Sequence, residues 1–205
     1  MPYKTTLRIL FSSLLLSVFL QAEAQTEVDS LKALLPSLEG TERMDVLNVI
    51  SDRLRAIDPN ESLRINTEVL EEAAKNGHHK QLASAMLVRA ALFINLDKSE
   101  EAEDILIEAK EVAFKAGDYK TTANLYLTLG NLHARRENHS LAIEEILNGL
   151  RVVEAEGDER MTVAFLTNIG YIHQRTGNLE QAEKVLNRAA EISERIGLVF
   201  RAGEV

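Results

Sequence analysis

Histidine and acidic side chains are the residues that could do chemistry in this 205-residue chain, because it contains no cysteine. His133 and His173 stand 40 residues apart, an interval that recurs along the chain, and they could form a metal pair or a pH sensor. Equal positions in neighbouring repeats lie about 10 Å apart, as packed helices do, whereas a metal–nitrogen bond is about 2 Å long. We therefore interpret both histidines as residues that pack between helices.

Acidic residues occur in short runs, among them Glu71-Glu72 and Glu144-Glu145. Such runs could indicate carboxylate catalysis or calcium binding, but the spacing of a calcium-binding loop is missing. Acidic side chains near helix starts are favoured by the helix dipole, so we interpret the runs as solvated helix faces. The sequence also lacks a phosphate-binding glycine loop, a zinc-protease motif and a Gly-x-Ser-x-Gly elbow. We predict a protein that is not an enzyme and holds no metal or cofactor.

The overall composition is that of a helical, acidic protein. Hydrophobic residues make up 45% of the chain, charged residues 27% and aromatic residues 5%. The abundant alanine, leucine and glutamate are good helix formers. A formal net charge of -9 argues against nucleic-acid binding, which depends on lysine and arginine neutralising phosphates.

Residues 1–24 have the pattern of a secretory signal peptide. Lys4 and Arg8 precede an uncharged, mostly apolar run at residues 9–20, and the triplet AEA ends the segment. The apolar run is shorter than the roughly 20 residues that a membrane span needs, and no other apolar segment is long enough. We therefore expect cleavage before Gln25 and a mature protein, without a membrane span, in the periplasm or outside the cell.

A 40-residue period organises the rest of the chain and indicates a tandem array. It links Gly77, Gly117, Gly157 and Gly197, and also Ala102, Ala142 and Ala182. Two amphipathic helical patterns alternate within each period. We expect first helices near 42–56, 80–96, 120–135 and 160–176, and second helices near 60–76, 99–116, 139–156 and 179–196. Residues 25–41 should form a short lead-in helix, and each repeated glycine should end a second helix in the left-handed conformation.

A small residue, an alanine twelve positions later and a large apolar residue four positions further on resemble the tetratricopeptide repeat. The fourth unit shows this pattern with Gly170, Ala182 and Leu186, whereas the first unit departs from it with Ser62 and Asn66. The period of 40 residues is similar to that of long-linker relatives such as kinesin-light-chain-like arrays. The resemblance covers about residues 42–205. It implies an all-α, right-handed superhelical solenoid of antiparallel helix pairs, with four pairs and the start of a fifth.

The resemblance also implies a ligand site on the concave face, which the first helices form. The residues implied to line this groove are Arg55, Asn95, Asn124, Asn131, Arg135, Thr167, Tyr171, Gln174 and Arg175. Three arginines in one groove would favour an acidic or C-terminal carboxylate peptide through charge-assisted hydrogen bonds. Alternatively, these arginines pair with acidic residues of neighbouring helices.

Two functions are compatible with these patterns. The first is a non-catalytic, exported scaffold that binds a peptide or protein segment in the concave groove. The alternative is the extracytoplasmic input domain of a larger signalling protein, such as a histidine kinase, cyclase or transcription regulator, and the sequence after Val205 would distinguish the two. The chain stops where a fifth first helix should begin, so we also expect residues 179–196 to expose apolar side chains and favour self-association.

The leader generates the first testable prediction. Export should remove residues 1–24, because small residues flank the expected cleavage site, and the mature N-terminus should be Gln25. Intact-mass spectrometry of the exported protein measures this directly. Recovery of exported protein that still carries Met1 would contradict the prediction.

Overall fold

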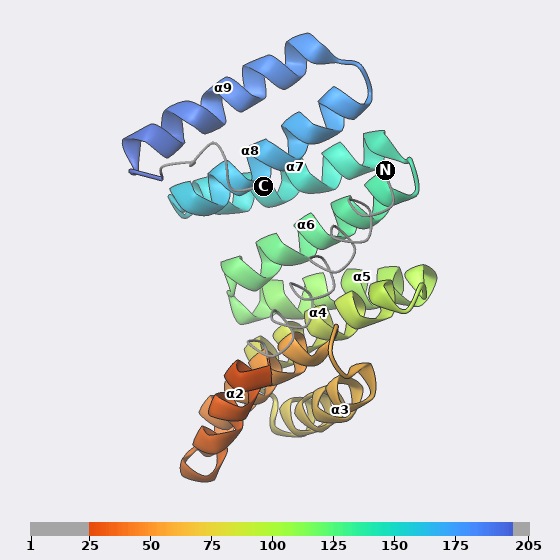
Figure 1. Ribbon diagram of the computed structural model, residues 1–205, viewed down its shortest axis with the longest axis vertical. Coiled ribbons are helices and arrows are strands. Elements are labelled where there is room, and N and C mark those ends of the chain that lie inside the picture. The colour runs from red at the N-terminus through yellow and green to blue at the C-terminus, as the bar shows by residue number, and fades with distance from the viewer. Residues whose placement is uncertain (1–24, 199–205) are drawn as a thin grey trace, which may run out of the picture.

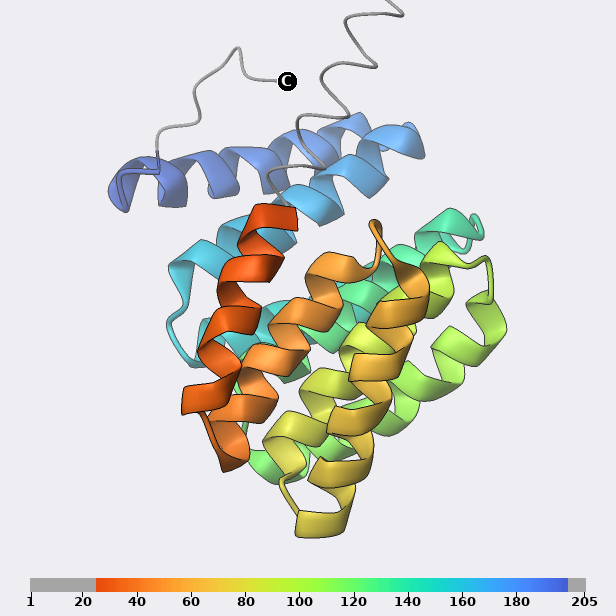
Figure 2. The same ribbon diagram turned by 60° about the horizontal axis from the view of Figure 1, so that its bottom comes forward.

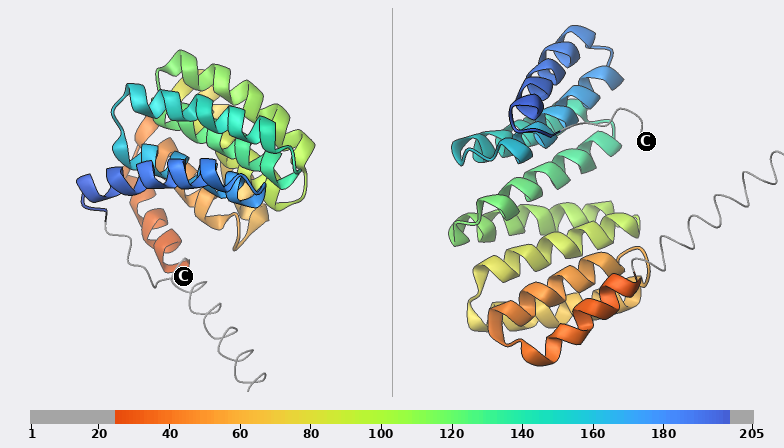
Figure 3. Two further views of the ribbon diagram at one scale, coloured as in Figure 1. Left: turned by 90° about the horizontal axis from the view of Figure 1, so that it is seen from above. Right: turned by 60° about the vertical axis from the view of Figure 1, so that its left-hand side comes forward.

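The computed structural model describes residues 25–198, and it is an array of antiparallel helix pairs (Figures 1 and 3). Residues 25–34 are helical. The following elements are η1 (Leu35–Ser37), α2 (Gly40–Leu54), α3 (Pro59–Asn76), α4 (His79–Asn95), α5 (Ser99–Ala116), α6 (Tyr119–Arg135), α7 (His139–Ala155), α8 (Glu159–Arg175) and α9 (Leu179–Arg195). The prediction of an all-α solenoid is confirmed, and the eight helices of the four pairs begin and end within two residues of their expected bounds. The expected signal peptide and the expected start of a fifth pair lie outside the described residues.

Aspartate side chains cap the N-termini of three helices, the second helix α3 and the first helices α6 and α8. Asp58 accepts hydrogen bonds from the backbone N–H groups of Asn60 and Glu61 at 3.1 and 3.0 Å, at the start of α3. Asp118 and Asp158 accept one each at the starts of α6 and α8. These bonds satisfy N–H groups that a helix start leaves without partners.

Left-handed residues end the helices at regular intervals. Gly77 and Gly117 follow the second helices α3 and α5 with φ of 71° and 66°, and Gly157 and Gly197 occupy the equivalent positions. The turns inside the second and third pairs use non-glycine residues for the same geometry, since Asp97 has φ of 58° and Glu137 has φ of 62°. A side chain in this region costs about 1–2 kcal/mol, so these two turns carry strain that the glycine turns avoid.

Small residues let the paired helices approach closely in the third and fourth pairs. A Cβ atom on Gly170 would lie 2.6 Å from Cδ2 of Leu186, and one on Gly130 would lie 2.5 Å from Cγ1 of Ile146. A Cβ atom on Gly149 would overlap the ring of Phe165, which is fully buried. The glycines therefore determine how near the helices α6 to α9 lie to one another.

The first pair packs through polar side chains at the same positions. Ser62 donates its hydroxyl hydrogen to the carbonyl oxygen of Ser51 at 2.7 Å, and Ser51 donates to the carbonyl oxygen of Ser62 at 3.0 Å. Asn66 donates to the carbonyl oxygen of Ala85 at 2.8 Å and accepts from Nε of Arg89 at 2.7 Å. Partial burial lowers the pKa of Arg89, which stays charged near neutral pH because the usual pKa of arginine is above 12. These bonds satisfy the buried polar groups that distinguish the first unit from the others.

The lead-in segment packs against the first pair (Figure 2). Val28 is fully buried in one apolar cluster with Met44 of α2 and Val69 of α3. Lys32 pairs with Glu61 at 2.9 Å. Residues 25–34 therefore cover the end of the array where no earlier pair is present among the described residues.

The outward face of α9 is more polar than the face of α7 to which α8 packs. Asn187, which is exposed, stands one period after Leu147. Leu179 is the one large apolar side chain classed as exposed among the described residues of α9. Self-association through this helix stays a prediction.

The left-handed turns generate a prediction about stability. Replacing Gly117 by alanine should lower the free energy of unfolding by about 1–2 kcal/mol, because alanine would be strained at a positive φ. Replacing Glu137 by glycine should raise it by up to about 1 kcal/mol for the converse reason. Urea denaturation followed by circular dichroism measures both effects.

Glu108→Gly is the matched control, because Glu108 is exposed in the interior of α5. There glycine should lower the free energy of unfolding by about 1 kcal/mol. A loss of stability in Glu137→Gly equal to that in Glu108→Gly would show that the turn at residue 137 carries no strain.

Candidate ligand-binding groove

A hollow of about 660 Å³ lies among the first helices of three successive pairs, α2, α4 and α6. Its lining residues are Asp45, Asn48, Val49, Asp52, Arg53, Arg55, Lys80, Ser84, Leu87, Val88, Ala91, Asn124, Leu127, Thr128 and Asn131. The lining combines small and medium apolar side chains with amides, hydroxyls and charged groups. A volume of this size is within the range of ligand-binding sites in proteins.

The hollow contains part of the groove that the sequence predicts. Arg55, Asn124 and Asn131 line it. Asn95, Arg135, Thr167, Tyr171, Gln174 and Arg175 do not line it, and all six are exposed. Four of these six belong to α8, which contributes nothing to the hollow. The predicted groove residues therefore form two groups, the three that line the hollow and the six exposed ones outside it, which we call the open half.

The three predicted groove arginines have different surroundings. Arg55 donates from Nε to Asp52 of its own helix at 2.8 Å. The guanidinium of Arg175 lies 5.8 Å from the ring centroid of Tyr171, a distance typical of a cation–π contact. Arg135 makes no ion pair with the described residues. None of the three pairs with an acidic residue of a neighbouring helix, so the alternative interpretation of these arginines is wrong for the described chain.

Asn48 supplies a buried polar group to the hollow. The residue is 4% exposed, and its Nδ2 atom donates a long hydrogen bond of 3.4 Å to the carbonyl oxygen of Gln81. Its Oδ1 atom is buried and has no hydrogen-bond partner in the structure. An unpaired buried acceptor costs about 1–3 kcal/mol, and a donor from a ligand would remove that cost.

The charged residues of the hollow are mostly paired, with one exception. Arg53 pairs with Glu27 at 3.2 Å, and Asp45 accepts from Nε2 of Gln81 at 3.2 Å. Lys80 is exposed and has no ion pair within the described part of the chain. Lys80 is therefore the positive charge most available to a ligand in the hollow.

Sequence reasoning missed Asn48 and Lys80, although the period contains a signal for both. Lys80, Lys120 and Arg160 are spaced by 40 residues near the starts of successive first helices, and all three are exposed. Asn48 shares its repeat position with Val88 and Thr128, which also line the hollow.

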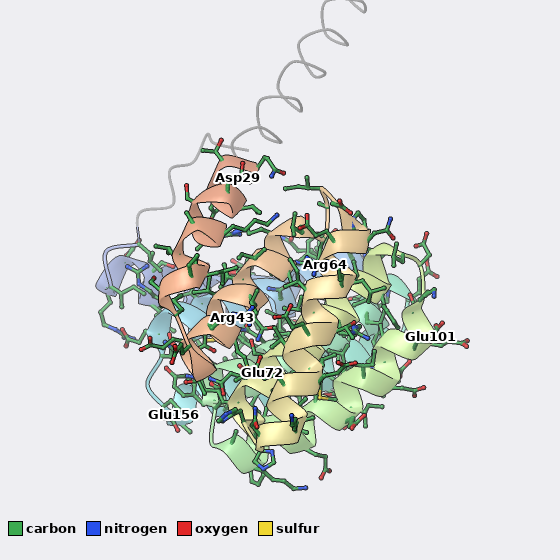
Figure 4. All side chains as sticks on the ribbon, turned by 90° about the horizontal axis from the view of Figure 1, so that it is seen from below. Asp29, Arg43, Arg64, Glu72, Glu101 and Glu156 are labelled. Carbon is green, nitrogen blue, oxygen red and sulfur yellow. The ribbon has the colours of Figure 1, made fainter. Side chains whose placement is uncertain are left out.

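The outer surface carries ion pairs between neighbouring helices. Arg43 of α2 pairs with Glu68 and Glu72 of α3 at 2.8 and 3.8 Å, and Figure 4 shows Arg43 and Glu72 on adjacent helices.

Within residues 25–198, no three histidine or acidic side chains are grouped so that they could hold a metal ion. None of the described helices combines the length and the apolar character needed to cross a bilayer.

Comparison with known proteins identifies the repeat. Residues 163–195 match the tetratricopeptide repeat family model. This segment contains Gly170, Ala182 and Leu186, on which the resemblance rests. A search of curated protein sequences found no match.

Several solved structures have a similar fold. Aspartyl phosphate phosphatase F from Bacillus subtilis has a TM-score of 0.74 and 14% identity, over 85% of this chain and 50% of that chain. A Rap protein complexed with Competence and Sporulation Factor has a TM-score of 0.74 and 16% identity, over 86% and 51% of the two chains. A signal-transduction ATPase with a tetratricopeptide repeat sensor from Pyrococcus horikoshii has a TM-score of 0.71 and 16% identity, over 87% and 28%. The chain thus spans about half the length of the first two, and identities this low establish the fold alone.

Proposed function

We propose that this chain, whose residues 163–195 match the tetratricopeptide repeat, is a non-catalytic scaffold that binds an extended segment of another protein in the hollow between α2, α4 and α6. The observation that carries the proposal is the buried, unpaired Oδ1 atom of Asn48 among the amides and hydroxyls of that hollow. The Rap protein complexed with Competence and Sporulation Factor has a similar fold, which supports a binding role.

The chemistry of the lining suits a polypeptide backbone. An extended segment presents alternating N–H and C=O groups, and side-chain amides can both donate to and accept from them. Asn124 and Asn131 line the hollow from α6 and are exposed. The apolar groups of Leu87 and Leu127 between them would contact the side chains of the bound segment.

The charges of the concave face favour an acidic segment. Lys80 lies in the hollow without an ion pair, and Arg135 and Arg175 are exposed further along the first helices. The chain as a whole has a net charge of -9, so unpaired cations on one face are distinct from their surroundings. Charge-assisted hydrogen bonds from arginine to carboxylates are stronger than bonds between neutral groups.

Export is part of the proposal and rests on residues 1–24, which have the pattern of a signal peptide. The partner would then be a periplasmic or extracellular protein.

A second function is favoured by the likeness to a signal-transduction ATPase with a tetratricopeptide repeat sensor. In that alternative, this chain is the extracytoplasmic input domain of a larger signalling protein, and the bound segment is its signal. The coding sequence after Val205 distinguishes the two, since a membrane span followed by kinase, cyclase or regulator motifs would favour the input domain.

The proposed groove predicts that one exposed amide contributes to binding. A peptide selected from a random display library on the purified protein provides the ligand, and fluorescence anisotropy measures its Kd. Asn131→Ala should weaken binding about threefold to tenfold, the range expected for one hydrogen bond. Asn187→Ala is the matched control, because Asn187 is exposed on the second helix α9. Equal affinities of the two variants would place the peptide outside the hollow.

The arginines of the open half generate a separate prediction. Arg135→Ala/Arg175→Ala should raise the Kd of an acidic peptide by more than about tenfold, because each charge-assisted bond contributes about 1.5–3 kcal/mol. Arg151→Ala/Arg195→Ala removes the same charge from the second helices α7 and α9 and should leave the Kd almost unchanged. The midpoint of thermal unfolding should shift little in either variant, since exposed ion pairs contribute about 0–1 kcal/mol to stability. If both double variants bind the peptide like the original protein, the arginines do not belong to the site.

A further inference from the structure

A second cavity, of about 300 Å³, lies between the helices α7, α8 and α9. Its lining residues are Ile143, Leu147, Leu150, Leu166, Ile169, His173, Gln181, Lys184, Val185 and Arg188. Six of these ten side chains are apolar, and none is acidic. This cavity, which we call the α7–α9 crevice, shares no lining residue with the hollow between α2, α4 and α6.

The preceding second helices, α5 and α7, fill the equivalent space between them with their own side chains. Lys110 of α5 pairs with Glu145 of α7 at 3.1 Å, and its Nζ atom lies 4.7 Å from the ring centroid of Tyr126. One period later, the positions of Lys110, Glu145 and Tyr126 are taken by three apolar residues. These are Leu150, Val185 and Leu166, and all three line the α7–α9 crevice. The crevice is therefore the place where a bridging ion pair has been replaced by apolar side chains.

An acidic side chain is missing from the crevice in the same way. Between α5 and the end of α6, Glu103 pairs with Arg136 and has an oxygen 3.9 Å from Nε2 of His133. One period after Glu103 stands Ile143, while His133 is repeated as His173. His173 thus lines the crevice without the carboxylate that its counterpart has nearby.

The rim of the crevice is positively charged. Arg188 pairs with Glu154 at 2.5 Å. Lys184 is exposed and makes no ion pair with any described residue. A cavity with an apolar lining, a free ammonium group and no acidic lining residue is complementary to a molecule that is apolar along its body and negative at one end.

We propose that the α7–α9 crevice binds a small amphiphile with an alkyl or aryl body and one anionic headgroup, such as a medium-chain carboxylate. The alkyl body contacts Leu150, Leu166 and Val185, and the headgroup lies near Lys184 and His173. A volume of about 300 Å³ is at the lower end of the range for small-molecule sites, which favours a small molecule over a folded partner. The proposal is independent of peptide binding by the hollow.

Dodecanoate below its critical micelle concentration is the probe, and isothermal titration calorimetry measures binding to the purified protein. We expect one site per chain. Leu150→Lys/Val185→Glu transplants the Lys110–Glu145 pair one period along, so it should fill the crevice and weaken dodecanoate binding by about tenfold or more, since burial of the apolar chain supplies most of the affinity. Circular dichroism should show an unchanged helix content, because the same pair is already accommodated between α5 and α7.

The reciprocal variant is the matched control. Lys110→Leu/Tyr126→Leu/Glu145→Val should open an equivalent cavity between α5 and α7 and add a second site for dodecanol, the uncharged analogue of the probe. Lys184→Gln should weaken the binding of dodecanoate about twofold to fivefold, as expected for an exposed ion pair, and should leave the binding of dodecanol unchanged.

Three results would overturn the proposal. The first is the absence of dodecanoate binding, and the second is equal binding by the original protein and Leu150→Lys/Val185→Glu. The third is a dimer in light scattering that this variant converts to a monomer, because the crevice would then be covered by a second copy of the chain.

Discussion

The close approach of paired helices is the constraint on which the rest of this structure depends. Gly130 and Gly170 stand where a Cβ atom would overlap Ile146 and Leu186 of the partner helix. In a repeat array each helix contacts only its neighbours, so the spacing of each pair determines where the next one lies. The first helices α2, α4 and α6 are successive steps of this array, and together they surround the hollow.

The helix bounds could be predicted from the sequence because their determinants are local. A glycine just after a helix can adopt a positive φ and end the helix without strain, and the glycines that follow α3 and α5 recur at the period of the chain. Gly149, by contrast, stands where the resembled repeat usually has alanine, and only the structure shows that the ring of Phe165 occupies the space of its missing side chain. A contact of that kind depends on two helices at once and has no local signal.

The site could be predicted only in part because α2 does not present the same face as the other first helices. Met44 shares its repeat position with Ser84 and Asn124, which line the hollow. Met44 itself is fully buried in the cluster that contains Val28 of the lead-in segment. The lining from α2 therefore begins at the next residue, Asp45. Its counterparts Ala85 and Leu125 are fully buried, so a residue-by-residue transfer from one repeat to the next misses Asp45.

The 40-residue period aligns equivalent positions of the repeats, so a position whose side chain differs between repeats is informative. Because energetic coupling in such arrays runs between neighbours, one interface can change its chemistry while the next keeps its geometry. Ser62 donates a hydrogen bond to Ser51 within the first pair, and Asn66 donates one to Ala85 of α4 in the next pair. Lys110 and Glu145 form an ion pair between α5 and α7, and apolar residues replace that pair between α7 and α9. Equal positions with unequal chemistry thus separate what the fold requires, which is the small residue at each close approach, from what an individual surface is free to bind.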